Sequence, residues 1–111
     1  MVMNLENRII YSNYNNITEI LYQKFVYLIV SRGVPAVSFD YYVKHSYSLI
    51  NLLINLKLPF VLITNYKSSD ILDKIYWCED VFDDAFIWTQ DQIFFEKEEQ
   101  VTLFHLRWGG K

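Results

Sequence analysis

The chain has 111 residues and a formal net charge of −3. Hydrophobic residues make up 52% of it and charged residues 21%, which excludes a disordered chain, because disorder requires low hydrophobicity and high net charge. A chain of this length holds one core, so we expect a single globular domain over residues 1–111.

A short strand and a helix are predicted first. Residues 8–11 have the composition of a strand. Asn16 and Glu19 have the spacing of a capping box, and apolar residues follow at helical spacing. Gly33 then provides a left-handed stop, so the helix is predicted over residues 17–31.

A second helix is predicted to begin at Asp40 or Ser46 and to end near Lys57, where Pro59 prevents its continuation. Its apolar face carries Val43, Tyr47, Ile50, Leu53 and Ile54, and is widened by Leu49, Leu52 and Leu56. A helix with so wide a face is expected to be broadly buried. Residues 60–64 form a continuous apolar run, which is typical of a central strand covered on both faces.

The remaining elements are a third helix over residues 69–78 and three strands near the C-terminus. The strand-like runs are AFIWT, QIFFE and QVTLFHLRW, and their links are short and polar, as in an antiparallel meander. The order of elements predicts an α/β (α+β) single-domain sandwich. Its sheet is expected to be mixed, mostly antiparallel and of about four or five strands, with three helices and a C-terminal three-strand meander.

Three features bear on the compartment. Cys78 is the sole cysteine, so no disulfide forms within the chain, and a reducing environment is favoured. The longest apolar run has six residues, whereas a membrane span needs roughly 20. The first ten residues have no signal-peptide pattern. We therefore expect a cytoplasmic protein without a membrane partner.

Charge is concentrated late in the chain. Residues 70–99 contain ten acidic residues and two lysines, for a net charge of −8. Within this window lies the acidic aromatic segment, residues 76–92, which combines five acidic residues with two tryptophans. A surface of this composition repels phosphate backbones and attracts cationic partners, so direct nucleic-acid binding is not expected.

No catalytic or cofactor motif is present in the sequence. Cys78 is a poor nucleophile because the acids beside it oppose ionisation, and His45 and His105 lie far from it along the chain. Metal-ligand spacings and a glycine-rich phosphate loop are both missing. We therefore expect neither an enzyme nor a cofactor or metal site.

The sequence instead predicts an acidic protein-binding inhibitor of the immunity-protein type. Such a protein neutralises a cationic, nucleic-acid-directed toxin or effector by covering its active site. Carboxylates would steer the partner, and aromatic rings would supply the desolvated anchor. The predicted partner-binding residues are Trp77, Glu79, Asp80, Phe82, Asp83, Asp84, Trp88 and Asp91. A monomer is favoured.

Three alternatives remain open at this stage. The tryptophans of the segment could belong to the core, with the acids only solvating its rim. A small-ligand or regulatory α/β domain would place its site in the loop from Thr64 to Asp70, which follows a buried strand. A homo-oligomer would use its exposed aromatic rings as the interface.

Overall fold

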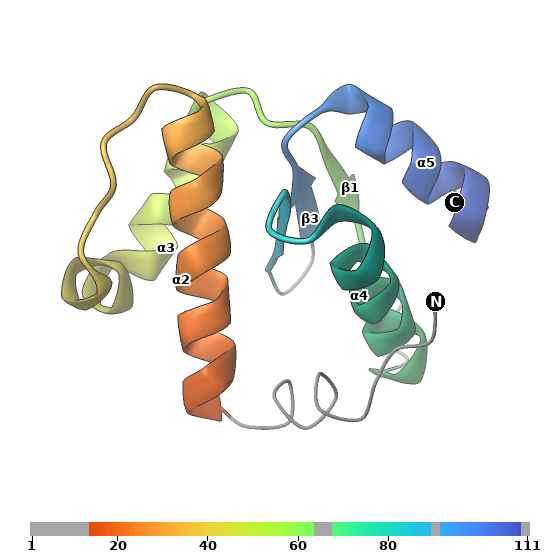
Figure 1. The fold of residues 1–111 in the computed structure, drawn as a ribbon, viewed down its shortest axis with the longest axis horizontal. Helices are drawn as coiled ribbons and strands as arrows, with labels where there is room; N and C mark the ends of the chain where they lie inside the picture. The colour runs from red at the N-terminus through yellow and green to blue at the C-terminus, as the bar shows by residue number, and fades with distance from the viewer. Residues whose placement is uncertain (1–13, 64–67, 90–91, 110–111) are drawn as a thin grey trace.

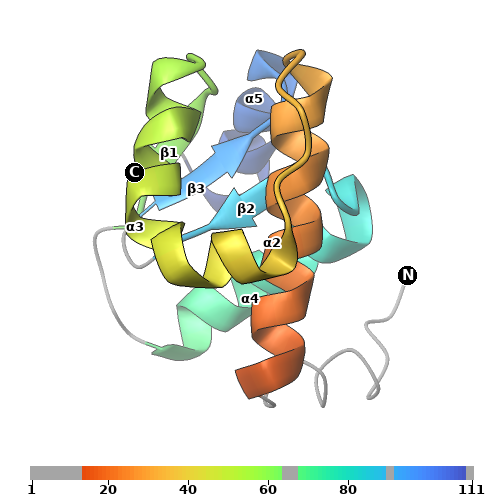
Figure 2. The same ribbon diagram turned by 90° about the vertical axis from the view of Figure 1, so that its left-hand side faces the viewer.

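The computed structural model describes residues 14–63, 68–89 and 92–109, without the side chains of residues 14–16 and 68–70 (Figure 1). The elements in chain order are α2 (Tyr14–Ser31), α3 (Phe39–Asn55), β1 (Phe60–Leu62), α4 (Ser68–Phe82), β2 (Phe86–Trp88), β3 (Gln92–Phe95) and α5 (Glu98–Trp108). They form three layers, with α2 and α3 on one face of the sheet and α4 and α5 on the other (Figures 1 and 2).

The sheet is antiparallel, in the order β1-β3-β2. Its central strand β3 is fully buried at Ile93, Phe94 and Phe95. Since neighbouring side chains of a strand point to opposite faces, Ile93 and Phe95 pack toward α4 and α5, while Phe94 packs toward α2 and α3. Helices therefore cover both faces of β3, which explains why its three consecutive residues, Ile93, Phe94 and Phe95, are all apolar.

Several predicted elements are confirmed. The helix predicted over residues 17–31 is α2, but it begins at Tyr14, so the predicted cap Asn16 lies inside the helix. The helix predicted up to Lys57 is α3, but its N-cap is Ser38 rather than Asp40 or Ser46, because the Ser38 hydroxyl accepts from the Tyr41 N–H. The runs AFIWT and QIFFE pair as the hairpin of β2 and β3. The strand predicted at residues 8–11 lies outside the described residues.

The predicted strand count and the C-terminal meander are wrong. The described residues contain four helices and three strands, and the run QVTLFHLRW forms α5 rather than a third strand of a meander. Val101, Phe104 and Trp108 recur at helical spacing and pack toward the sheet. Gln100 Oε1 accepts a 2.7 Å hydrogen bond from the Lys97 N–H, and Gly109 ends the helix at φ 88°.

The expected position of the strand at residues 60–64 is also wrong. Among the described residues, β1 pairs with β3 alone and lies at the edge of the sheet, where both Phe60 and Leu62 are exposed. The third helix extends past residue 78 to Phe82, because its last turn buries Cys78 and half-buries Phe82 against the core.

The helix α3 is less broadly buried than predicted. It buries Tyr42, Leu49 and Leu53, whereas Val43 and Tyr47 are exposed. The backbone is non-helical at His45, where two helical parts meet at an angle (Figure 2). None of the helices in the described ranges combines the length and apolar character needed to cross a bilayer.

Candidate protein-binding surface

The acidic part of the segment folds as the last turn of α4 and the tight turn after it. Asp83 ends the helix in a left-handed conformation, with φ 54°, and its N–H donates to the carbonyl of Glu79 over 3.3 Å. Aspartate is among the few non-glycine residues that tolerate this conformation. The turn then passes directly into β2, so the carboxylates at positions 79, 83 and 84 are held next to the sheet.

Lys24 of α2 is the unexpected centre of this turn. Its side chain has no exposed area, and Nζ lies 2.7 Å from Glu79 Oε2 and 3.6 Å from Asp84 Oδ1. Nζ also donates to the carbonyl of Asp83 over 2.8 Å and lies 4.3 Å from the centre of the Phe86 ring. A buried ammonium needs such partners, because an uncompensated charge in the interior is costly. Glu79 therefore has an internal role.

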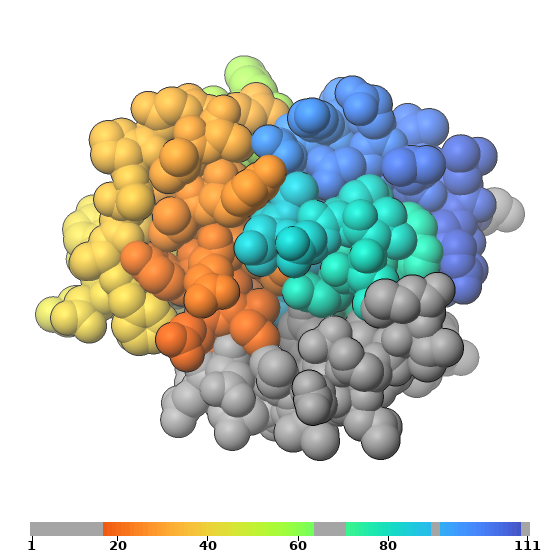
Figure 3. Space-filling view, in the orientation of Figure 1, coloured from red at the N-terminus to blue at the C-terminus, as the bar shows by residue number. Residues whose placement is uncertain are grey.

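Other carboxylates of this region gather around Tyr27, one helical turn after Lys24 on α2. The Tyr27 hydroxyl donates to Glu96 Oε1 over 3.3 Å. Glu96 is the main cause of a raised pKa of Tyr27, and partial burial, Asp84 and Asp83 add to it. We call Tyr27, Asp83, Asp84 and Glu96 the acidic surface. Figure 3 shows α2, the turn after α4 and the start of α5 meeting on this face.

The acidic surface is open to a partner. Tyr27 is 44% exposed, the Asp84 side chain is 46% exposed, and Asp83 is exposed. Arg32 lies at its edge but is occupied, since its guanidinium donates to the carbonyls of Leu56 and Glu96. Lys24 is buried, so the outward-facing groups of this surface are carboxylates and a phenol.

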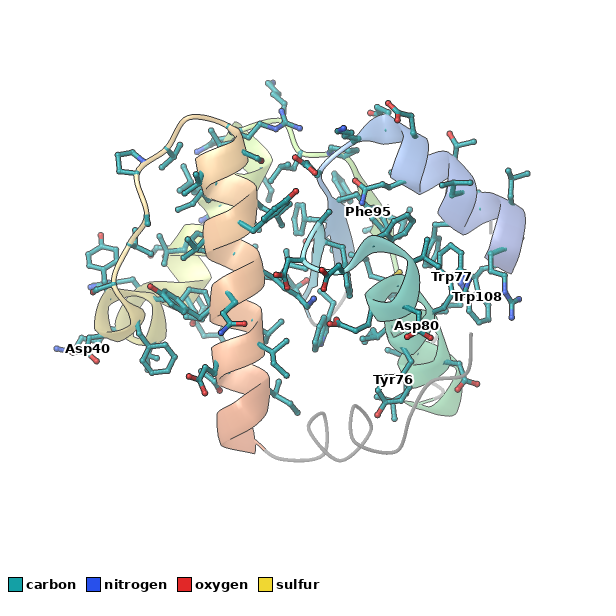
Figure 4. The ribbon with its side chains drawn as sticks, in the orientation of Figure 1. Asp40, Tyr76, Trp77, Asp80, Phe95 and Trp108 are labelled. Atoms are coloured by element: carbon teal, nitrogen blue, oxygen red, sulfur yellow. The ribbon has the colours of Figure 1, made fainter. Side chains whose placement is uncertain are left out.

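The predicted aromatic anchors are mostly part of the core. Trp77 is half-buried between α4 and α5, where its ring makes edge contacts with Phe82, Phe104 and Trp108 (Figure 4). Trp88 is half-buried on β2 and stacks on Phe86. The structure thus brings Glu79, Asp83 and Asp84 together, but it directs the rings of Trp77 and Phe82 into packing between elements.

Two of the predicted partner-binding residues, Asp80 and Asp91, are not part of this cluster. Asp80 is half-buried on α4, one turn after Tyr76 and on the same side of the helix (Figure 4). Asp91 lies outside the described residues, as do residues 64–67 of the alternative ligand loop. The side chains of residues 68–70 are not described either.

Cys78 is fully buried, and burial raises the pKa of its thiol far above the usual value. Lys24 lowers this pKa and Glu79 raises it by smaller amounts. Cys78 is therefore a poor nucleophile mainly because its thiol is desolvated, and the nearby acids named in the sequence analysis contribute less. No group of three or more His, Cys, Asp or Glu side chains within the described ranges is placed to hold a metal ion.

Sequence reasoning missed Lys24, Tyr27 and Glu96 as members of the site. One signal was available for Lys24, because it occupies an inward position in the apolar stripe of α2, where a lysine requires an acidic partner. Tyr27 and Glu96 carry no such signal, since they are 69 residues apart and meet only in the folded chain.

Comparison with known proteins identifies no relative of this chain. No protein-family model, no curated protein and no solved structure matches this chain. The function of the chain is therefore inferred from the charge, exposure and contacts of its own residues.

Proposed function

We propose that this chain is an acidic protein-binding inhibitor of the immunity-protein type, acting in the cytoplasm as a monomer. Its partner would be a cationic, nucleic-acid-directed toxin or effector whose active site it covers. The cleft of such a partner binds phosphate and is lined by Lys and Arg, which makes it complementary to a cluster of carboxylates.

The observation that carries the proposal is that Glu96, which accepts a hydrogen bond from the exposed Tyr27, is bonded through its N–H to the Ala85 carbonyl and so lies beside the turn that carries Asp83 and Asp84. These residues come from two connections and one helix, and the acids retain a net negative charge after Lys24 has compensated Glu79. Carboxylates can pair with a partner's Lys or Arg, and the tyrosine ring can stack on a guanidinium. In this proposal Tyr27 takes the anchoring role that the sequence assigns to Trp77, Phe82 and Trp88.

The experiment is a binding titration with the product of the neighbouring reading frame as the candidate partner, repeated at low and high salt. Reversing both charges in an Asp83→Lys, Asp84→Lys variant is expected to weaken binding by about 10–100-fold at low salt. The salt dependence of the remaining affinity should also decrease, because fewer ion pairs form.

Asp73→Lys is the matched control. Asp73 is exposed earlier on α4 and is not one of the carboxylates that act on Tyr27. This variant should keep both the affinity and its salt dependence. Equal affinity of the wild-type and the doubly reversed protein for a partner that binds would refute the proposed surface. A candidate product that does not bind at low salt would count against the proposed class of partner.

A further inference from the structure

A second, chemically different site lies where α2, the bent part of α3 and the end of β2 meet. There the described residues line a half-open pocket of about 380 Å³. Ile17 and Leu21 line it from α2, Tyr42 and Ser46 from α3, and Trp88 from β2. This volume lies near the lower end of the range of roughly 300–1,000 Å³ that is usual for small-molecule sites.

The bend in α3 shapes this pocket. The non-helical residue His45 lies between Tyr42 and Ser46, so the two halves of the helix each contribute one wall. A straight helix would present these two residues one turn apart on a single face. The bend contains no proline or glycine, and it is therefore a feature of the packing rather than of a helix-breaking residue.

Hydroxyl groups give the pocket its polar character. Tyr42 is only 6% exposed, and its ring is held by edge or tilted contacts with Tyr22 and Phe25 at 5.6 and 5.3 Å. Tyr42 lines the pocket and brings a hydroxyl to it. Burial raises the pKa of Tyr42, so this group stays a neutral donor. Ser46, on the opposite side of the bend, adds another hydroxyl to the lining.

The lining also determines the charge of the occupant. None of the residues that line the pocket, all of them in the described ranges, carries a charge. A charged ligand would lose hydration there without gaining a counter-ion, whereas a neutral one would not. The rings of Tyr42, Tyr47 and Trp88 favour a flat molecule, and the hydroxyls favour one with a hydrogen-bonding group.

We infer that the pocket between α2, α3 and β2 binds a small neutral aromatic molecule whose polar group hydrogen-bonds to the hydroxyls of Tyr42 and Ser46. This inference goes beyond the proposed function and is independent of it. The pocket contains Trp88 of the acidic aromatic segment but no residue of the acidic surface.

The test uses benzamide and benzoate, which have nearly the same shape but differ in charge, and follows the backbone amide signals of the isotope-labelled protein by NMR. Benzamide should shift signals of residues around the pocket with a dissociation constant of about 1 mM, a usual value for a ligand of this size. Benzoate should bind at least about 10-fold more weakly, because its charge has no partner there.

Two variants locate the site. Tyr42→Phe removes only the hydroxyl and should weaken benzamide binding about 3–10-fold. Ser46→Leu fills the pocket from its wall and should abolish the shifts. The control Ser48→Leu makes the same change at an exposed position of α3 and should bind benzamide as the wild type does.

Several outcomes would overturn the inference. They are the absence of localised shifts at about 10 mM benzamide, equal affinity for benzoate, and unchanged binding by a folded Ser46→Leu protein. A dimer in light scattering that Ser46→Leu dissociates would identify the pocket as a subunit interface instead. The Asp83→Lys, Asp84→Lys protein should keep its benzamide affinity, which separates this test from that of the proposed function.

Discussion

A single residue, Lys24, determines how the acidic part of the chain is arranged. Its ammonium is completely buried and is surrounded by the Glu79 and Asp84 carboxylates, the Asp83 carbonyl and the Phe86 ring. The lysine links α2 to the C-terminal end of α4, where a cation also interacts favourably with the helix dipole. It thereby holds the turn that contains Asp83 and Asp84 against α2.

Replacing Lys24 should therefore destabilise the fold. A Lys24→Met variant keeps most of the side-chain volume but leaves Glu79 and the Asp83 carbonyl without their buried cation. The free energy of unfolding, measured in urea, is expected to fall by about 2–4 kcal/mol. Lys44→Met, an exposed lysine on α3, should change it by less than about 0.5 kcal/mol. Equal effects of the two substitutions would contradict an internal role for Lys24.

Among the elements, α5 shows most clearly how a local pattern competes with tertiary contacts. The residues of α5 alternate well enough to suggest a strand, but a strand would face Leu106, which is 78% exposed, in the same direction as Phe104 and Trp108. The Gln100 side chain stabilises the first turn of α5 by two hydrogen bonds. Its Oε1 accepts from the Lys97 N–H, and its Nε2 donates to the Ala85 carbonyl over 2.9 Å.

Gln100 should consequently contribute more than an ordinary polar residue. A Gln100→Met variant leaves the Lys97 N–H and the Ala85 carbonyl without this partner. We expect a loss of about 1–3 kcal/mol in the free energy of unfolding, measured by denaturation in urea. The neighbouring exposed Glu99, changed to Met, serves as the control and should cost under about 0.5 kcal/mol. If Gln100→Met behaved like its neighbour, α5 would not depend on these two bonds.

At the scale of the whole molecule, the sheet separates two clusters of buried residues. One contains Phe94 and packs beneath α2 and α3, and the other contains Phe95 and packs beneath α4 and α5. The tryptophans, at positions 77, 88 and 108, all pack against the second cluster. Since β3 contributes to both clusters, the layers are expected to unfold together.

This cooperativity can be tested by tryptophan fluorescence, because Trp77 and Trp108 lie on the α4 and α5 side of the sheet. Phe94→Leu, on the other side, should reduce the free energy of unfolding by about 1–2 kcal/mol. The urea midpoints from fluorescence and from circular dichroism should shift together. Leu106→Ala, at a highly exposed position, should leave both unchanged. A shift in circular dichroism alone would show that the two layers unfold separately.

Much of the fold could be predicted from local patterns in the sequence. The helical spacing of its apolar residues and the stop at Gly33 located α2, and the short polar link between AFIWT and QIFFE located the β2–β3 hairpin. For the candidate site, the sequence located the acids at positions 79, 83 and 84 in one segment. In each case the information lies within a few residues of chain, where backbone conformation and charge are decided locally.

The sequence by itself determined the acidic character, the position of the helix that ends before Gly33 and the absence of a recognisable catalytic motif. Only the tertiary structure decided that β3 is central, that QVTLFHLRW is a helix, and that Trp77 packs inward while Tyr27 lies beside Glu96. The physical reason is that these outcomes depend on contacts between distant residues. Burial of Lys24 against Glu79 joins parts of the chain 55 residues apart, and no local pattern specifies such a partner.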